Sequence, residues 1–275
     1  EIGESAFEGC SSLKRIVIPE GVRSIREKTF CECTALQEIR LPDGLELIGR
    51  SAFSECEALQ EIRLPDGLKE IGSDAFSGCR SLRQITVPVG VKCIETAVFQ
   101  SCRALQEVHL PEGLEQIGMF AFEDCDTLTR IVLPASLKRL CRGAFENCTS
   151  LLEAQLPDGL EELQDDAFEY CRSLQKVTIP AQVRQIEQAA FYYCQSLQEV
   201  QLPEELNEIG EDAFAHCWAL KRIVIPAGVE KVGEHAFWEC YSLQNIAVLS
   251  DDTEIAEDAF EDCPGTVKRG TGSLF

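Results

Sequence analysis

Apolar residues recur along the chain with a fixed period of 23 residues. A phenylalanine stands at every twenty-third position from Phe7 to Phe260, and a cysteine follows each phenylalanine three residues later. A leucine comes three residues after the cysteine in every copy except the last, where Thr266 replaces it. Self-similarity at a period of this length is typical of stacked repeats, so we expect twelve structural copies without an insertion.

Each copy combines two shorter periodicities. In the segment QEIRL, Ile62 and Leu64 alternate with polar residues, and this period of two predicts a short β-strand. In the segment AFxxCxxL, apolar positions recur every three residues, which favours a 3₁₀ turn or a single helical turn. The segment PDGL between them predicts a turn, because proline fixes φ and glycine accepts a positive φ.

One copy therefore corresponds to one coil of a repeat solenoid: a strand, a Pro-Gly turn, a brief extended piece and a helical turn. A single coil cannot bury its own apolar face, whereas stacked coils bury a continuous core. We expect parallel strands on one face and the 3₁₀ or helical turns on the opposite face. The uninterrupted copies predict a single domain over 1–275, with repeats over 1–249 and the last coil with a polar C-terminal cap over 250–275.

The full unit, LxxIxLPxGLxxIGxxAFxxC, resembles the BspA-like subclass of leucine-rich repeats, which occurs in bacterial surface proteins. The resemblance covers essentially the whole chain, and the proline, the glycine, the Ala-Phe pair and the cysteine all fall at family positions. It implies a right-handed solenoid shaped as a horseshoe or curved rod, with the strands on the concave face. It also implies a protein-binding or cell-adhesion module at a bacterial surface, with host or matrix proteins as partners and glycans as a further class.

The cysteine of each copy raises three alternatives: a metal ligand, half of a disulfide, or a small apolar side chain. Stacked coils place these cysteines in one column with a spacing of about 4.8 Å. Zinc–sulfur bonds of about 2.3 Å cannot gather three such sulfurs around one ion, so we expect no metal site and no cofactor. Disulfides between neighbours fit the Cα spacing, but stacked side chains point the same way, and we interpret the column as core packing.

Three cysteines lie outside the column: Cys31, Cys93 and Cys141. Cys31 and Cys33 form a lone C-x-C, which is a weak metal signal without further ligands. Alignment of the copies places Cys93 and Cys141 at turn positions that we expect to face solvent. Exposed thiols are unusual in an oxidising compartment, and the first residues, EIGESAFEGC, show no signal peptide. A cytoplasmic scaffold or structural spacer is therefore the alternative to a cell-surface or secreted protein.

The composition disfavours several functions. Forty-seven acidic and 25 basic residues give a net charge of −22, which disfavours binding to nucleic acids and to anionic lipid surfaces. No run of 18 apolar residues exists, so we expect no membrane insertion. The three histidines cannot be combined with a nucleophile in the repeat geometry, and acidic pairs such as Asp165 and Asp166 occupy solvent-facing turns. We expect no catalytic residues and no enzyme.

Two surfaces are candidates for partner binding. The outward strand positions form a charged ladder of mixed sign, which is either a solvated set of ion pairs or a site of polar recognition. The turn side of coils eight to eleven is rich in aromatic residues, which either supply binding energy at an interface or stabilise the stack. The predicted partner-binding residues are Tyr170, Tyr192, Tyr193, His216, Trp218, Trp238 and Tyr241. The uncapped N-terminal edge is a further candidate, for self-association.

Overall fold

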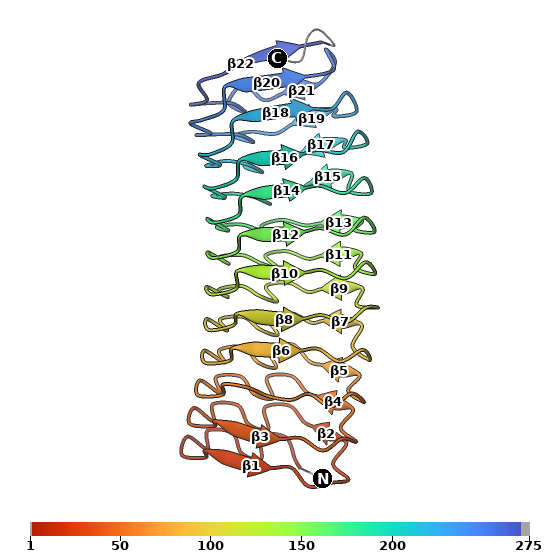
Figure 1. The fold of residues 1–275 in the computed structure, drawn as a ribbon, viewed down its shortest axis with the longest axis vertical. Coiled ribbons are helices and arrows are strands. Elements are labelled where there is room, and N and C mark those ends of the chain that lie inside the picture. Colours follow the sequence, from red (N-terminus) through yellow and green to blue (C-terminus); the bar gives the residue numbers. More distant parts are fainter. Residues whose placement is uncertain (1, 271–275) are drawn as a thin grey trace. The chain divides into compact units, whose positions relative to one another are not determined.

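The computed structural model describes residues 2–270 of the chain. Contacts divide the chain into two compact units, Glu1–Leu137 and Lys138–Phe275, and within each unit successive coils stack on one another (Figure 1). The strand pairings within each unit are parallel. The predicted leucine-rich-repeat solenoid of stacked 23-residue coils is therefore confirmed. Residues 271–275 of the predicted C-terminal cap lie outside the described residues.

A long strand of three or four residues forms one face of the coils. Partner residues lie 23 positions apart in the sequence, as in the pairs Arg15–Glu38 and Val177–Val200, except in the last pairing, where Asn245 pairs with Thr266. The first unit contains β1 (Arg15–Val17), β3 (Glu38–Arg40), β6 (Gln84–Thr86), β8 (Glu107–His109) and β10 (Arg130–Val132). The second unit contains β12 (Glu153–Gln155), β14 (Lys176–Thr178), β16 (Glu199–Gln201), β18 (Arg222–Ile225), β20 (Asn245–Val248) and β22 (Thr266–Arg269).

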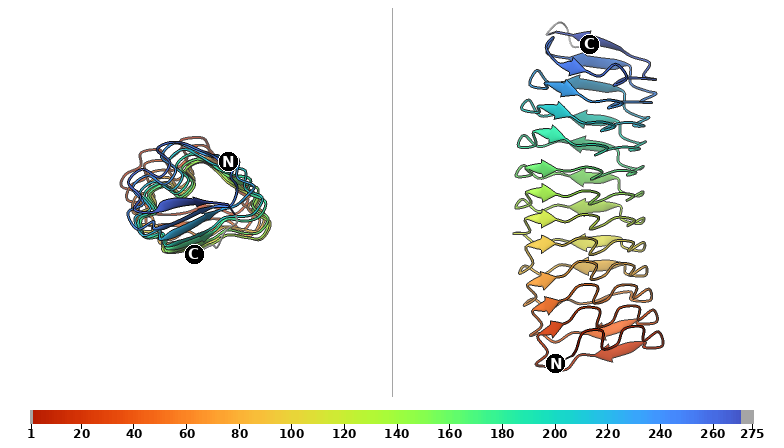
Figure 2. Two further views of the ribbon diagram at one scale, coloured as in Figure 1. Left: turned by 90° about the horizontal axis from the view of Figure 1, so that it is seen from above. Right: turned by 180° about the vertical axis from the view of Figure 1, so that it is seen from behind.

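A second series of strands, each two residues long, lies on another side of the coils (Figure 2). Its apolar residues stack in register, as Ile25 does with Ile48, and both of these side chains are fully buried. The first unit contains β2 (Ser24–Ile25), β4 (Leu47–Ile48), β5 (Glu70–Ile71), β7 (Cys93–Ile94) and β9 (Gln116–Ile117). The second unit contains β11 (Arg139–Leu140), β13 (Glu162–Leu163), β15 (Gln185–Ile186), β17 (Glu208–Ile209), β19 (Lys231–Val232) and β21 (Glu254–Ile255).

The copy at residues 61–64 keeps the predicted burial but does not form the predicted strand. Ile62 and Leu64 are buried while Glu61 and Arg63 are exposed, as the alternation predicts. Among the described residues, however, the amides of residues 61–64 donate to no backbone oxygen. The ladder of long strands is therefore interrupted between β3 and β6.

Like charges distinguish the copy that lacks a strand. The ladder is also divided between β8 and β10 and between β16 and β18, where the aligned charges are opposite. The second and third copies are nearly identical in sequence, so Glu61 occupies the stacking position next to Glu38. Arg63 likewise occupies the position next to Arg40. Like charges at directly opposite positions destabilise strand pairing. Where β1 and β3 pair, by contrast, Arg15 lies opposite Glu38 and forms an ion pair with it at 3.6 Å.

The expected 3₁₀ or helical turn is replaced by isolated turns, and no helix occurs in residues 2–270. The amide of Cys33 does donate to the Phe30 carbonyl oxygen at 3.2 Å, which is the expected bond to the third preceding residue. Lys28 and Glu32, however, have positive φ angles of 53° and 59°. A left-handed residue ends a right-handed helical turn. The amide of Phe30 then bonds to the next coil, at Ala52 O, rather than within its own turn.

The repeated phenylalanines form a stacked column inside each unit. The rings of Phe30 and Phe53, for example, lie 5.5 Å apart between centroids and only 4° from parallel. Both side chains are completely buried, together with a leucine and a cysteine of each inner coil. Parallel rings in contact are favourable beyond their buried area. The phenylalanine of each coil thus packs on the phenylalanine of the next coil and stabilises the stack.

The buried cysteines of the column contribute a hydrogen bond as well as packing. The Sγ of Cys56 donates to the carbonyl oxygen of Phe30 at 3.2 Å, and the same oxygen accepts the amide of Cys33. The bond from each cysteine to the phenylalanine 26 residues earlier recurs along both units, at 3.1–3.4 Å. Burial raises the pKa of Cys33 to about 11, so this thiol keeps its proton. The position therefore favours a small side chain that is also a donor.

Two cysteines outside the column are less exposed than the sequence predicts. Cys141 is buried, with 8% of its surface exposed, and Cys93 is half-buried within β7. Cys31 is also buried at 8%. The expectation that Cys93 and Cys141 face solvent is therefore wrong. The equivalent residue three coils earlier is Gly72, where an added Cβ would lie 2.7 Å from the backbone of the preceding coil. This position therefore faces the neighbouring coil and not solvent.

The glycine of the Pro-x-Gly turn serves two different purposes. Gly21 and Gly113 have positive φ angles of 90° and 93°, as predicted for this turn. Gly90 does not, but a Cβ there would lie 2.4 Å from the carbonyl oxygen of Leu68 in the preceding coil. Close stacking of coils therefore requires glycine at Gly90 even where the backbone conformation does not.

We predict that Cys56→Ala lowers the free energy of unfolding by about 1–2 kcal/mol, because it removes the sulfur from the core and one hydrogen bond of the Phe30 carbonyl. Cys10 is exposed, and Cys10→Ala serves as the control that leaves stability unchanged. Urea unfolding followed by circular dichroism measures both variants. Equal stability of the two variants would show that the buried thiol contributes nothing.

Candidate binding surfaces

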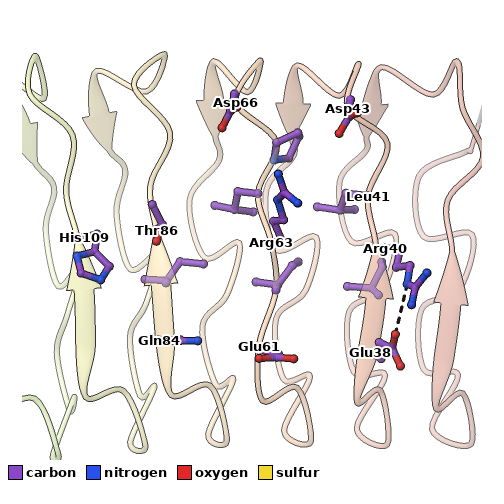
Figure 3. Close-up of a pocket in the computed structure, with 15 residues that line it drawn as sticks. Glu38, Arg40, Leu41, Asp43, Glu61, Arg63, Asp66, Gln84, Thr86 and His109 are labelled. Atoms are coloured by element: carbon purple, nitrogen blue, oxygen red, sulfur yellow. Dashed lines mark ion pairs between the residues drawn. The ribbon is translucent and has the colours of Figure 1, made fainter.

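The long-strand face of the first unit contains a polar groove of about 790 Å³ (Figure 3). It lies over the interrupted part of the ladder, where Glu61 and Arg63 project between the neighbouring coils. Buried isoleucines form its floor and charged side chains its walls. The groove is lined by Glu38, Ile39, Arg40, Leu41, Asp43, Glu61, Ile62, Arg63, Leu64, Pro65, Asp66, Gln84, Ile85, Thr86 and His109.

Ion pairs form within and between coils along this strand face. Glu38 contacts Arg15 of the preceding coil at 3.6 Å and Arg40 of its own strand at 3.4 Å. In the second unit Glu199 contacts Lys176 at 3.5 Å and Arg222 at 3.0 Å. These side chains are largely exposed, and exposed ion pairs contribute about 0–1 kcal/mol each. The strand face is thus a solvated ladder, and its polar groove can hold hydrogen-bonding groups.

The turn side of the second unit brings the seven predicted residues into one continuous cluster, which we call the aromatic band. Its centre is Tyr193, whose ring lies 4.0 Å from the ring of His216. Tyr170 is 5.1 Å from Tyr193 on one side, and Trp218 is 6.2 Å from it on the other. The remaining members of the band, with their contacts, are Tyr192 (4.8 Å from Tyr193), Trp238 (4.7 Å from His216) and Tyr241 (6.2 Å from Trp218).

The band has a buried base and an exposed edge. His216 retains only 4% of its exposure and lies beneath the surrounding rings. Trp218 and Tyr241, by contrast, are 38% and 53% exposed. The other four rings are half-buried. The band therefore presents a firm aromatic surface in which Trp218 and Tyr241 are the most accessible groups.

Three members of the band occupy a backbone conformation that large side chains rarely adopt. Tyr170, Tyr193 and His216 have φ angles of 55°, 57° and 60°. The same position is left-handed in every copy: two copies hold Gly9 and Gly78, for which positive φ carries no steric penalty, and the others outside the band hold Glu, Ser, Asp or Asn. For a residue with a Cβ this conformation costs about 1–2 kcal/mol. The copies that hold glycine were the sequence signal for this strain, and the sequence prediction did not use it.

Glu239 lies at the edge of the band and links two of its members. Its Oε2 is 3.0 Å from Nδ1 of the buried His216, although the alignment of the two groups gives this nitrogen no hydrogen bond among the described residues. A hydrogen bond to Glu239 also raises the pKa of Tyr241 to about 12. Sequence reasoning missed Glu239, because it considered only the aromatic members of each column.

Glu169, next to Tyr170, carries a carboxyl group with a strongly altered proton affinity. Burial raises its pKa from 4.5 to about 7, and the neighbouring carboxylates of Asp166 and Glu146 raise it further, while Arg142 partly offsets them. Burial also raises the pKa of Asp212 in the next-but-one coil. The surroundings of the band thus hold more negative charge than nearby cations compensate.

The described residues offer no obvious metal or membrane site. Within residues 2–270, no group of three or more histidine, cysteine or acidic side chains is placed to hold a metal ion. Over the same range, no helix is long and apolar enough to cross a bilayer. The two surfaces above are therefore the features from which a function can be argued.

Comparison with known proteins identifies the repeat. The family model for the BspA type leucine rich repeat region matches residues 1–102, 69–194 and 161–268. A leucine-rich repeat protein from Bacteroides ovatus is similar in structure, with a TM-score of 0.73, 29% sequence identity, and coverage of 97% of this chain and 81% of the other. A leucine rich cell surface protein from Faecalibacterium prausnitzii has a TM-score of 0.58 and 26% identity, and the match covers 98% of this chain and 82% of the other.

The pneumococcal vaccine antigen PcpA shares the fold, with a TM-score of 0.61 and 21% identity over 95% of this chain and 69% of that protein. No curated protein is significantly similar to the chain in sequence. The comparisons thus establish the type of repeat and leave the binding surfaces to be argued from the structure.

We predict that Glu169→Gln stabilises the protein above pH 7 and has little effect near pH 4.5. The folded pKa of about 7 exceeds the value of 4.5 in the unfolded chain. The folded state therefore binds the proton more tightly, and the contribution of Glu169 to stability falls as the pH rises through this window. Urea unfolding at pH 4.5 and pH 8 measures the change, with Glu204→Gln at an exposed site as the control. A gain that is equal at the two pH values would contradict the prediction.

Proposed function

The chain belongs to the BspA-type leucine-rich repeat family, and we propose that it is a non-catalytic module that binds a protein partner through the aromatic band. The single observation that supports this most is the gathering of seven aromatic side chains on one surface, where Trp218 and Tyr241 are exposed. Leucine-rich repeats provide extended surfaces for interaction, and this band is where the copies depart most from their common pattern.

The composition of the band supports a role in binding. It contains both tryptophans and all four tyrosines of the chain. These residue types dominate interface energetics, because they bury a large area while few rotamers are frozen. Tyr170 and Tyr193 occupy a turn position that is left-handed in every copy and that smaller or acidic residues fill outside the band.

A bacterial surface or secreted location is part of the proposal. A structural neighbour is described as a leucine rich cell surface protein. The cytoplasmic alternative relied in part on exposed thiols at Cys93 and Cys141, and these side chains are half-buried and buried. Host or matrix proteins are the proposed partners.

Two further interactions remain predictions. The polar groove of the first unit suits a glycan better than the band does, because its walls carry carboxylate and guanidinium groups that bind hydroxyls. In the first coil Phe7, Leu13 and Ile16 are partly exposed, whereas their copies in inner coils are buried. Self-association at this edge would cover them.

We predict that the triple variant Tyr193→Asn, Trp218→Ser and Trp238→Ser loses partner binding with a change in unfolding free energy of no more than about 2 kcal/mol. Asparagine accepts the left-handed φ of 57° at Tyr193. Surface plasmon resonance against immobilised matrix and serum proteins measures binding, and urea unfolding measures stability.

The matched control replaces three exposed valines outside the band, Val17, Val89 and Val132, by serine. It should bind as the unaltered protein does. A triple variant that binds normally but is strongly destabilised would show that the band supports the fold and is not a binding surface.

A further inference from the structure

Carboxylates flank the aromatic band at both ends. Glu169 precedes it beside Tyr170, and Glu239 lies against its base at His216. Beyond Glu239, the copies of the same turn positions in the last coil are Glu261 and Asp262, both exposed. Negative charge at both ends of an exposed aromatic surface favours a cationic partner and repels an acidic one.

The band already contains one example of how a cation is held. The guanidinium of Arg172 lies over the ring of Tyr170, 5.5 Å from its centroid. Arg172 occupies the position that follows the repeat cysteine, and in the tenth and eleventh coils the same position holds Trp218 and Tyr241. These two rings are the most exposed of the band, and no cation-ring contact involves them among the described residues. They offer open faces to an external cation.

The spacing of the two exposed rings matches an extended peptide. Trp218 and Tyr241 lie 6.2 Å apart, and the half-buried Tyr193 lies 6.2 Å from Trp218. In an extended chain, alternate side chains point to one side and repeat every 6.6–6.8 Å, on the order of this spacing. A segment that runs along the stack can therefore place every second side chain on a successive ring.

We propose that the aromatic band binds an extended protein segment with arginine at alternate positions, whose guanidinium groups stack on Trp218 and Tyr241. The flanking carboxylates of Glu239 and Asp262 pair with the same groups. Arginine fits better than lysine, because its planar group stacks on a ring and still donates to carboxylates at its edge. This inference rests on the proposed function and names the chemistry of its partner.

The raised pKa of Glu169 also indicates a negative electrostatic potential near the band. Burial and like charges raise the pKa of Glu169 to about 7, because the local negative potential is not compensated. Charged groups that face Glu169 are Asp166, Glu146, Asp212 and the partly compensating Arg142. An added cation stabilises the ionised carboxylates, so the peptide should bind more tightly at pH 8 than at pH 5.5.

The test uses the full chain and four labelled octapeptides. Three of them alternate serine with arginine, lysine or glutamate, and the fourth has the composition of the arginine peptide with its four arginines in one block. Fluorescence anisotropy gives the affinities. Tryptophan fluorescence reports occupancy of the band directly, because both tryptophans of the chain belong to it.

We expect the alternating arginine peptide to bind several-fold more tightly than the lysine and block peptides, and the glutamate peptide not to bind. Trp218→Ser combined with Tyr241→Ser should weaken the arginine peptide at least tenfold, whereas Val17→Ser combined with Val132→Ser should leave it unchanged. Equal binding to all three cationic peptides, or equal binding by the two double variants, would overturn the proposal, because general attraction to an acidic protein would then suffice.

Failure of this inference is distinguishable from failure of the proposed function. If the unaltered protein does not bind the arginine peptide, but the triple variant still loses binding to its immobilised protein partner, the band binds a partner of other chemistry. If partner binding survives the triple variant, the proposed function itself is wrong. Binding of the arginine peptide that quenches tryptophan fluorescence and disappears in the aromatic double variant supports both.

Discussion

Every coil of this protein rests on a near copy of itself, and this like-on-like stacking is the constraint on which the rest of the structure depends. A fixed step of 23 residues places ring over ring in the phenylalanine column, where Phe30 and Phe53 are nearly parallel. The same step directs the thiol of Cys56 to the carbonyl of Phe30, whose other lone pair is already occupied by its own coil. For apolar side chains and for paired hydrogen-bonding groups, repetition is favourable, because a geometry that works once works in every coil.

For charged side chains the same repetition is unfavourable. The second and third copies place Glu61 beside Glu38, and the strand ladder is interrupted there. The polar groove of the first unit lies at this interruption (Figure 3). The two candidate binding surfaces therefore differ in origin. The polar groove lies where neighbouring copies carry the same charges, and the aromatic band lies where the copies differ in sequence. In the band, divergence places Tyr170, Tyr193 and His216 at a turn position that is left-handed in every copy, and their rings lie side by side on one surface.

The sequence was sufficient for whatever depends on the repeat step alone. It predicted the columns, the alternation of Ile62 and Leu64, and the proximity of Trp218 to Tyr241, because stacking fixes which positions are neighbours. It failed for features that depend on the distance between neighbouring coils or on the charges that they carry. The left-handed residues of the turn, the burial of Cys141 and the hydrogen bond of Cys56 depend on how closely two backbones approach. The loss of pairing at residues 61–64 depends on charges in the adjacent coil, and a single copy of the motif cannot reveal it.

Amide hydrogen exchange of the first unit, resolved by segment, is the most direct test of the account. It measures whether the strand pairing of a residue depends on the equivalent residues in the neighbouring coils. We predict that residues 61–64 exchange at least ten times faster than the paired strand residues 84–86. We also predict that Glu61→Lys, which places a cation between Glu38 and Gln84, slows this exchange. Exchange of residues 61–64 as slow as that of β6 would contradict the account. So would exchange that Glu61→Lys does not alter, because like charges in adjacent coils would then not be what weakens strand pairing at these residues.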